Sequence, residues 1–165
     1  MGIDINLLAE DFTPDPISLL ESNRNLGYSI EEAISDLIDN SISAMATEIS
    51  YELNWNNGKP YFLLKDNGKG MSNENNQLVN SFRLGSKNPL DERDPNDLGR
   101  FGFGMKTASL SQARELIVIT KKEGFKTLTR SLDLNFIAQL NGSWTLKNVI
   151  DEEIKNTSDS KRETL

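Results

Sequence analysis

The feature of this chain that most restricts its fold is a change in hydrophobic periodicity near residue 47. Apolar and small residues recur at helical spacing across residues 30–45, and Ser29 followed by Glu32 forms a capping box in front of them. Polar and apolar residues then alternate strictly through "EISYELNW", the pattern of a half-buried strand. The sequence therefore predicts a helix over 29–46 that leads directly into a strand. The helical stripe consists of Ile30, Ala33, Ile34, Leu37, Ile38, Ser41, Ala44 and Met45.

The segments after this point predict a hairpin, a second helix and more strands. The turn "NNGKP" joins the first strand to "YFLLK", which predicts an antiparallel hairpin over 48–65. A short helix is expected over 73–82, a helix from about Met105 to Gln112, and strands over 115–123, 125–134 and 143–149. This order predicts an α+β fold: a two-layer sandwich whose single, mixed but mostly antiparallel sheet is covered on one face by helices.

The length of 165 residues suits one domain with a sizeable core. We expect an N-terminal arm over 1–27, with a short helix near 17–23, and the domain itself over 28–150. The polar segment 84–104 carries four glycines and two prolines. The charged, apolar-poor stretch 151–165 is interpreted as a linker.

Composition excludes several classes of function. The chain has no cysteine and no histidine, which excludes disulfides, thiolate or imidazole metal sites and histidine-based triads. Catalysis would have to use carboxylates, Lys, Arg, Asn, backbone amides or a bound metal. A net charge of −7 argues against a stand-alone nucleic-acid binder. The short apolar runs and the N-terminal sequence match neither a membrane span nor a signal peptide, so a cytoplasmic protein without membrane contact is expected.

The polar face of the first predicted helix carries Asp36 and Asn40, which are four residues apart and therefore share a face. Such a pair can hold a metal ion while the carboxylate orients a water molecule. A solvated helix face explains the same residues, although Asp and Asn are poor helix formers at interior positions.

The segment "DNGKGM" follows the second predicted strand. Asp66 at the strand end can accept a hydrogen bond from an exocyclic amine, and Gly68 and Gly70 allow the backbone to approach a planar ligand closely. An ordinary strand-end turn also favours these residue types.

Gly99, Gly102 and Gly104 precede the helix predicted from Met105. Amides at a helix N-terminus bind phosphate, and Lys106 would add positive charge. The spacing is neither that of a P-loop nor that of a Rossmann turn, since no parallel strand leads directly into it. A phosphate site of another architecture and a set of plain turns both remain open at this point.

The order of the three motifs is more specific than any one of them. "DLIDNSISA", "DNGKGM" and "GRFGFGMK" resemble, in that order, the motifs of the gyrase B, heat-shock chaperone, histidine kinase and MutL (GHKL) ATPase superfamily. "GRFGFGMKTAS" is most similar to the microrchidia-type and MutL-like bacterial branch. The resemblance covers roughly residues 28–125 and implies a Bergerat-type ATP-binding fold.

The resemblance implies a role for each matching residue. Asn40 would coordinate the Mg²⁺ that bridges the phosphates of ATP, and Asp66 would receive the adenine amine. Gly68, Gly70 and Met71 would lie beside the base, and residues 84–104 would form a mobile lid over the phosphates. Ser86 and Lys87 are further candidate phosphate contacts. The third motif would supply the remaining nucleotide-binding positions, which are Gly99, Arg100, Phe101, Gly102, Phe103, Gly104, Met105 and Lys106.

The chain also departs from the family pattern. Glu usually occupies the position four residues before the Asn and activates the attacking water, but here that residue is Asp36. Ser43 stands where many relatives have Asp. Thr145 is a candidate for the threonine or serine that lies beside adenine, and a residue beyond 165 is an equal candidate. Nothing in the chain matches the transducer domain that usually follows, so a larger protein is expected.

The resemblance implies a Mg²⁺-dependent ATP-binding module that hydrolyses ATP slowly, with Asp36 as the base, and uses closure to drive homodimerisation. One alternative is a nucleotide-dependent switch without meaningful hydrolysis, which the Asp at position 36 motivates. A histidine-kinase-type phosphotransferase is less favoured because the chain has no acceptor histidine. A structural domain without a ligand is the remaining reading. DNA-associated or defence-related work is expected, with DNA contacted through other domains.

Overall fold

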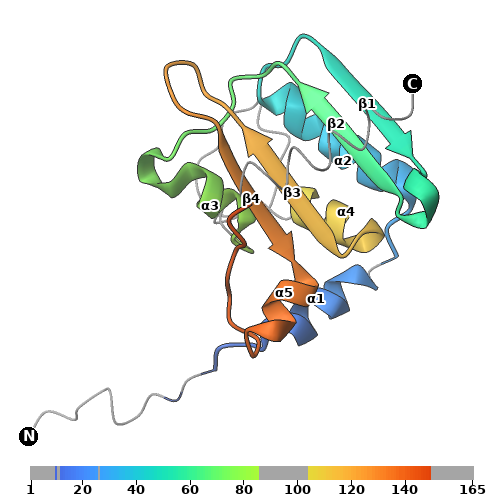
Figure 1. Cartoon of the computed structure of the whole chain (residues 1–165), viewed down its shortest axis with the longest axis vertical. Coiled ribbons are helices and arrows are strands. Elements are labelled where there is room, and N and C mark those ends of the chain that lie inside the picture. The colour runs from blue at the N-terminus through green and yellow to red at the C-terminus, as the bar shows by residue number, and fades with distance from the viewer. Residues whose placement is uncertain (1–9, 11, 26, 86–103, 150–165) are drawn as a thin grey trace, which may run out of the picture.

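The computed structural model describes residues 10, 12–25, 27–85 and 104–149, and these residues form an α+β fold (Figure 1). The predicted fold class is thus confirmed. In chain order the elements are α1 (Pro16–Arg24), α2 (Ile30–Ser43), β1 (Ile49–Asn54), η2 (Asn56–Gly58), β2 (Tyr61–Asp66), η3 (Glu74–Asn76), α3 (Gln77–Phe82), α4 (Gly104–Gln112), β3 (Glu115–Thr120), β4 (Leu128–Asp133) and α5 (Leu134–Gln139).

Helix α2 begins where the capping box predicts. The Ser29 side chain accepts a hydrogen bond from the Glu32 amide, and the Glu32 side chain accepts one from the Ser29 amide. The helix ends at Ser43, three residues earlier than predicted, because Met45 adopts a left-handed backbone (φ 62°) that cannot continue a helix. Of the predicted apolar stripe, Ala33 and Ser41 are buried, whereas Ile30 is 59% exposed.

The four strands form two antiparallel pairs. The predicted hairpin is confirmed: β1 pairs with β2 in a register that joins Ile49 to Asp66 and Asn54 to Tyr61. Strand β3 pairs with β4, with Glu115 opposite Asp133. Among the described residues these are separate two-stranded sheets rather than the single mixed sheet predicted. Figure 1 shows both pairs in one layer with α2 and α4 behind them in this view.

The region after β4 differs from the sequence-based prediction. The strand predicted over 125–134 ends at Asp133, whose side chain accepts hydrogen bonds from the Asn135 and Phe136 amides and caps α5, a helix that was not predicted. The strand predicted over 143–149 is reduced to one antiparallel bridge between Lys147 and Ser131.

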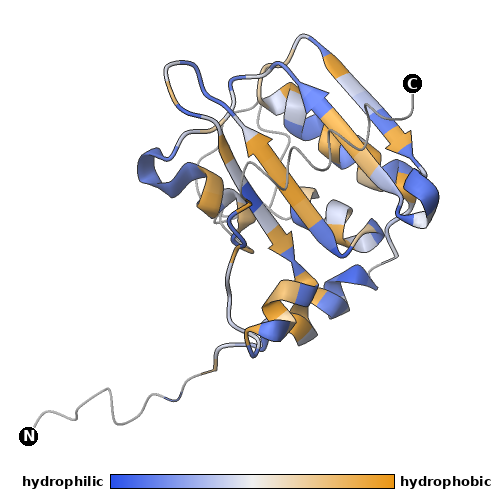
Figure 2. Cartoon of the chain, viewed as in Figure 1, coloured by the Kyte–Doolittle hydropathy of each residue, from blue (hydrophilic) through white to orange (hydrophobic). Residues whose placement is uncertain are grey.

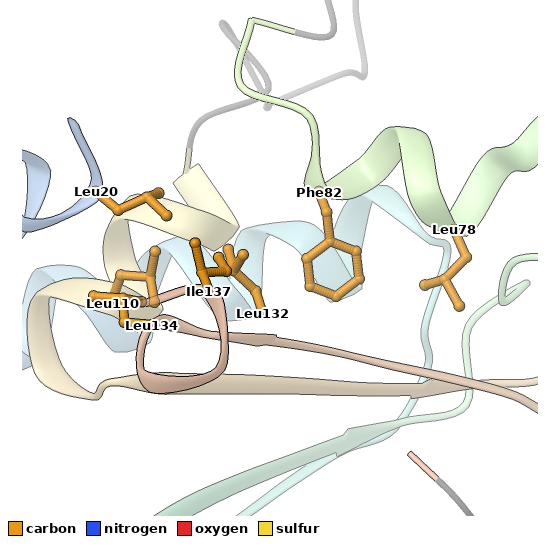
Figure 3. Close-up of a cluster of buried hydrophobic side chains, with 7 residues drawn as sticks. All are labelled: Leu20, Leu78, Phe82, Leu110, Leu132, Leu134 and Ile137. Atoms are coloured by element: carbon orange, nitrogen blue, oxygen red, sulfur yellow. The ribbon is translucent and has the colours of Figure 1, made fainter. Parts of the chain in front are cut away.

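The core joins elements from both halves of the chain. Figure 3 shows its buried side chains gathered between α1, α3, α4, α5 and β4. Figure 2 shows that β3 is hydrophobic along most of its length. Leu116 and Val118 on one face of this strand pack against the cluster, whereas Ile117 and Ile119 on the other face are exposed. The cluster consists of Leu20, Leu78, Phe82, Leu110, Leu132, Leu134 and Ile137.

The ends of the predicted domain are only partly described. The short helix expected near 17–23 is confirmed as α1, and its Leu20 is 1% exposed in the core. The predicted linker 151–165 and most of the predicted lid, residues 86–103, lie outside the described residues. In the described part of the chain, no helix has the length and apolar character that crossing a bilayer requires.

Candidate nucleotide site

Asp36 lies on the side of α2 that faces α4. Its carboxylate is half-buried, and a Cβ added to Gly104 at the start of α4 would lie only 3.3 Å from its Oδ2 atom. The same oxygen accepts a hydrogen bond from the Tyr28 hydroxyl at 3.0 Å. On the predicted polar face of this helix, Asp36 therefore lies against a neighbouring helix, whereas Asn40 is exposed.

A hollow of about 540 Å³ opens beside Asp36, along the first half of α2. Its lining residues are Gly27, Tyr28, Glu31, Glu32, Ser35 and Asp36, and three of them are acidic. Partial burial, followed by the hydrogen bond to Asp36 and the negative charges of Asp36 and Glu32, raises the pKa of Tyr28. The raised pKa means that the phenol stays protonated, and can donate to the carboxylate, to a higher pH than an ordinary tyrosine would.

Asn40 is exposed one turn further along α2. Its side-chain nitrogen donates to the Asp36 carbonyl oxygen at 2.7 Å, so its amide oxygen is the atom suited to a hard cation. Among the described residues no cluster of three or more acidic side chains could hold a metal by itself. An Mg²⁺ ion at Asn40 would therefore need oxygens from a bound phosphate group, the mode of binding that Mg²⁺ commonly adopts.

Asp66 ends β2 and is held by two hydrogen bonds. Its Oδ1 accepts from the Gly68 amide at 2.8 Å, and its Oδ2 accepts from the Ser41 hydroxyl at 3.2 Å. Ser41 is 3% exposed and was not among the residues singled out from sequence. The available signal was a small polar residue on the apolar stripe of α2, directly after Asn40.

The glycines after Asp66 pack against neighbouring backbone. A Cβ on Gly68 would lie 2.8 Å from the Ala44 carbonyl oxygen, at the end of α2. Gly70 has φ +61°, and a Cβ there would overlap the Lys121 carbonyl oxygen just after β3. The loop thus lies close to the end of α2 at Gly68 and close to the end of β3 at Gly70. A side chain at either position would clash with the neighbouring backbone.

We expect Gly70→Ala to destabilise the domain and to lower the affinity for any ligand that binds at the Asp66 loop. The left-handed backbone costs a non-glycine residue about 1–2 kcal/mol, and the overlap with Lys121 adds a further cost. Gly124→Ala is the matched control, since Gly124 has φ +78° but nothing within 4 Å of its added Cβ. Thermal denaturation should show a clearly larger loss for Gly70→Ala, and equal losses would contradict the packing argument.

Met71 links the loop to the core. Its amide donates to the Thr120 hydroxyl at 2.9 Å, and its side chain is partly buried against the core cluster. Its placement beside an adenine remains a prediction. So does the role of Thr145, whose hydroxyl donates to the Ser143 carbonyl oxygen at 3.2 Å.

The third motif is described only from Gly104 onward. Gly104 and Met105 open α4, whereas Lys106 is 2% exposed and its ammonium donates to the Ser81 carbonyl oxygen near the end of α3, at 2.8 Å. This contact ties together the two helices that flank residues 86–103, and the predicted phosphate contact of Lys106 remains a prediction. The other predicted positions, Ser86, Lys87, Gly99, Arg100, Phe101, Gly102 and Phe103, lie outside the described residues.

The arrangement is that of a particular class of domain: a capped helix with Asp and Asn on one side, an Asp–Gly loop after a hairpin, and a glycine-led second helix. Residues 28–164 match the family described as histidine kinase-, DNA gyrase B- and HSP90-like ATPase. The chain belongs to this family. The resemblance to the GHKL superfamily inferred from the three motifs is confirmed.

Individual relatives include microrchidia-type and MutL proteins, as the motifs predict. The chain is 28% identical to "ATPase morc-1" of Caenorhabditis elegans over 67% of its own length, and 38% identical to "DNA mismatch repair protein MutL" of Thermosipho melanesiensis over 55%. It is 34% identical to "ATPase MORC2B" of Mus musculus over 63%. These matches cover only 12%, 16% and 10% of the respective relatives, so the chain corresponds to a small part of each.

Proposed function

We propose that this chain binds ATP with Mg²⁺ between α2, the Asp66 loop and the start of α4, and that it hydrolyses the nucleotide slowly. Membership in an ATPase family supports ATP as the ligand. The observation that carries the site is that Ser41 of α2 and Gly68 hold Asp66. Asn40 precedes Ser41 directly on α2, and Asp36 lies one turn before Asn40.

Each part of the site has a chemical role in this proposal. Asp66 accepts the exocyclic amine of adenine while its own hydrogen bonds fix the carboxylate. The Asn40 oxygen, together with phosphate oxygens, would hold Mg²⁺, which would supply positive charge beside the phosphates when bound. The amides at the start of α4 would face the terminal phosphates, and Asp36 would orient the attacking water.

Calorimetric titration of the full-length protein with ATP tests this proposal. We expect binding in the presence of Mg²⁺ that weakens when the metal is chelated. The Asn40→Ala variant should bind about tenfold more weakly with Mg²⁺ but show little loss without it, because it removes a metal ligand rather than a nucleotide contact. No binding of ATP with Mg²⁺ would refute the proposal.

A nucleotide-dependent switch without hydrolysis is the second candidate, and the shorter Asp at position 36 favours it. Phosphate release above a blank, lost in Asn40→Ala, would exclude this candidate. ATP binding without phosphate release would establish it.

The longer protein is proposed to use nucleotide binding for closure of residues 84–104 and for homodimerisation. Relatives named as DNA mismatch repair proteins and microrchidia ATPases support work on DNA through other domains. Sedimentation of the full-length protein with and without a non-hydrolysable ATP analogue tests dimerisation, which should require the analogue.

A further inference from the structure

Tyr28 contacts Asp36 although eight residues separate them. Tyr28 immediately precedes the cap residue Ser29, whose extended backbone (φ −73°, ψ 162°) starts α2. Its half-buried ring reaches along the first two turns of the helix, and the hydroxyl donates to Asp36 Oδ2 at 3.0 Å. The contact joins the start of the helix to the carboxylate that is proposed to orient the attacking water.

Both ends of α4 hold this pair in place. At the C-terminal end, the Gln112 side-chain nitrogen donates to the Tyr28 carbonyl oxygen at 3.0 Å. At the N-terminal end, Gly104 lies next to the Asp36 carboxylate. A Cβ at position 104 would be 3.3 Å from Oδ2, which is a tight contact. The backbone of Tyr28 is thus held by α4, and the carboxylate of Asp36 lies against the start of the same helix.

The hydrogen bond from Tyr28 makes the two carboxylate oxygens of Asp36 different. Oδ2 accepts from Tyr28, while among the described residues no donor is recorded for Oδ1. A base must be held within about 0.5 Å of its working geometry to be effective. A short Asp side chain with one oxygen fixed by a tyrosine presents its second oxygen in a defined direction.

We infer that Tyr28 is a positioning residue for hydrolysis: it holds Oδ2 of Asp36 so that Oδ1 orients the attacking water. The inference rests on the proposed ATPase function. It differs from a purely structural role for Tyr28, in which the hydrogen bond would only stabilise the start of α2. The two roles predict different effects when the hydroxyl alone is removed.

The test compares Tyr28→Phe with the wild-type full-length protein. At saturating ATP, phosphate release should fall about tenfold, because the base loses its fixed geometry. Affinity for a non-hydrolysable ATP analogue should change by less than about twofold. The matched control is Tyr61→Phe, which removes a tyrosine hydroxyl that also donates to a carboxylate, Glu52 Oε1 at 2.8 Å, but on the β1–β2 hairpin. The control should change neither quantity.

A second readout does not depend on turnover. Alkaline titration followed by tyrosine absorbance should show a raised pKa for Tyr28, a signal that disappears in Tyr28→Phe. This pKa should be lowered in Asp36→Asn, since that variant removes the negative charge facing the phenol. An unchanged tyrosine titration in Asp36→Asn would show that the contact is absent and would overturn the inference.

The kinetic outcomes separate the inference from the function on which it rests. Normal turnover in Tyr28→Phe overturns the inference and leaves the ATPase proposal standing. A parallel loss of analogue affinity, thermal stability and turnover also overturns it, in favour of the structural role. A wild-type protein that binds ATP but releases no phosphate overturns the positioning role together with the hydrolysis proposal, while ATP binding stands.

Discussion

Replacing Asp66 by asparagine should lower the affinity for ATP about 30- to 100-fold. Hydrogen bonds to a charged group contribute about 1.5–3 kcal/mol, and the change removes the charge from the acceptor proposed for the adenine amine. In the wild type, the Gly68 amide and the Ser41 hydroxyl donate to the two oxygens of Asp66. Asparagine would place an NH₂ group, which is a donor, beside one of these two donors. Calorimetric titration with ATP and Mg²⁺ measures the loss directly.

Asp15→Asn is the matched control for this variant. Asp15 caps α1 by accepting a hydrogen bond from the Ser18 amide at 2.7 Å, and asparagine caps helices about as well as aspartate. The control makes the same chemical change and the same change in net charge, but away from the Asp66 loop. Retained ATP affinity in Asp66→Asn, or an equal loss in both variants, would remove Asp66 from the adenine site.

Asp36→Asn should reduce phosphate release at least about 100-fold while leaving ATP affinity within about threefold. A positioned general base contributes about 10²- to 10⁴-fold, and asparagine has nearly the shape of aspartate but cannot take up the proton of water. The amide oxygen can still accept from Tyr28, so the packing against Gly104 is preserved. Steady-state phosphate release and titration with a non-hydrolysable analogue give the two quantities.

The control for Asp36→Asn is Asp39→Asn, an exposed carboxylate on the same helix. It should affect neither turnover nor binding. If turnover survives in Asp36→Asn, Asp36 is not the base, and the water must be oriented by another group. If turnover falls equally in both variants, the loss reflects the net charge of α2 and not a base.

Local signals account for the elements that the sequence predicted well. The capping box at Ser29 and Glu32 lies within four residues, so its hydrogen bonds form as soon as the helix does. The β1–β2 hairpin follows from strict alternation joined by a short turn. Helix α5 was missed because Asp133 fits both a polar strand position and a helix cap, and the choice depends on burying Leu134 and Ile137 in the core.

The residues of the candidate site also divide into those that the sequence predicts and those that only the structure reveals. Asp36, Asn40 and Asp66 are predicted site residues on the basis of residue type, spacing and resemblance. Their partners Tyr28 and Ser41 are not, because a hydroxyl eight or 25 residues away in sequence gives no periodic signal. The Lys106 ammonium is buried and donates to the Ser81 carbonyl oxygen, 25 residues earlier in the chain, which the local sequence does not indicate, and its predicted role beside a phosphate stays a prediction.

By itself, the sequence determined the α+β class, the capped helix, the hairpin and the order of motifs that marks the ATPase family, since each of these depends on neighbours within a few residues or on their order. The tertiary structure alone decided which oxygen of Asp36 is held, by Tyr28 under Gly104, and which groups hold Asp66. These contacts form only when α2 packs against α4 and the loop after β2 reaches α2, because side-chain hydrogen bonds act over about 3 Å and not along the chain.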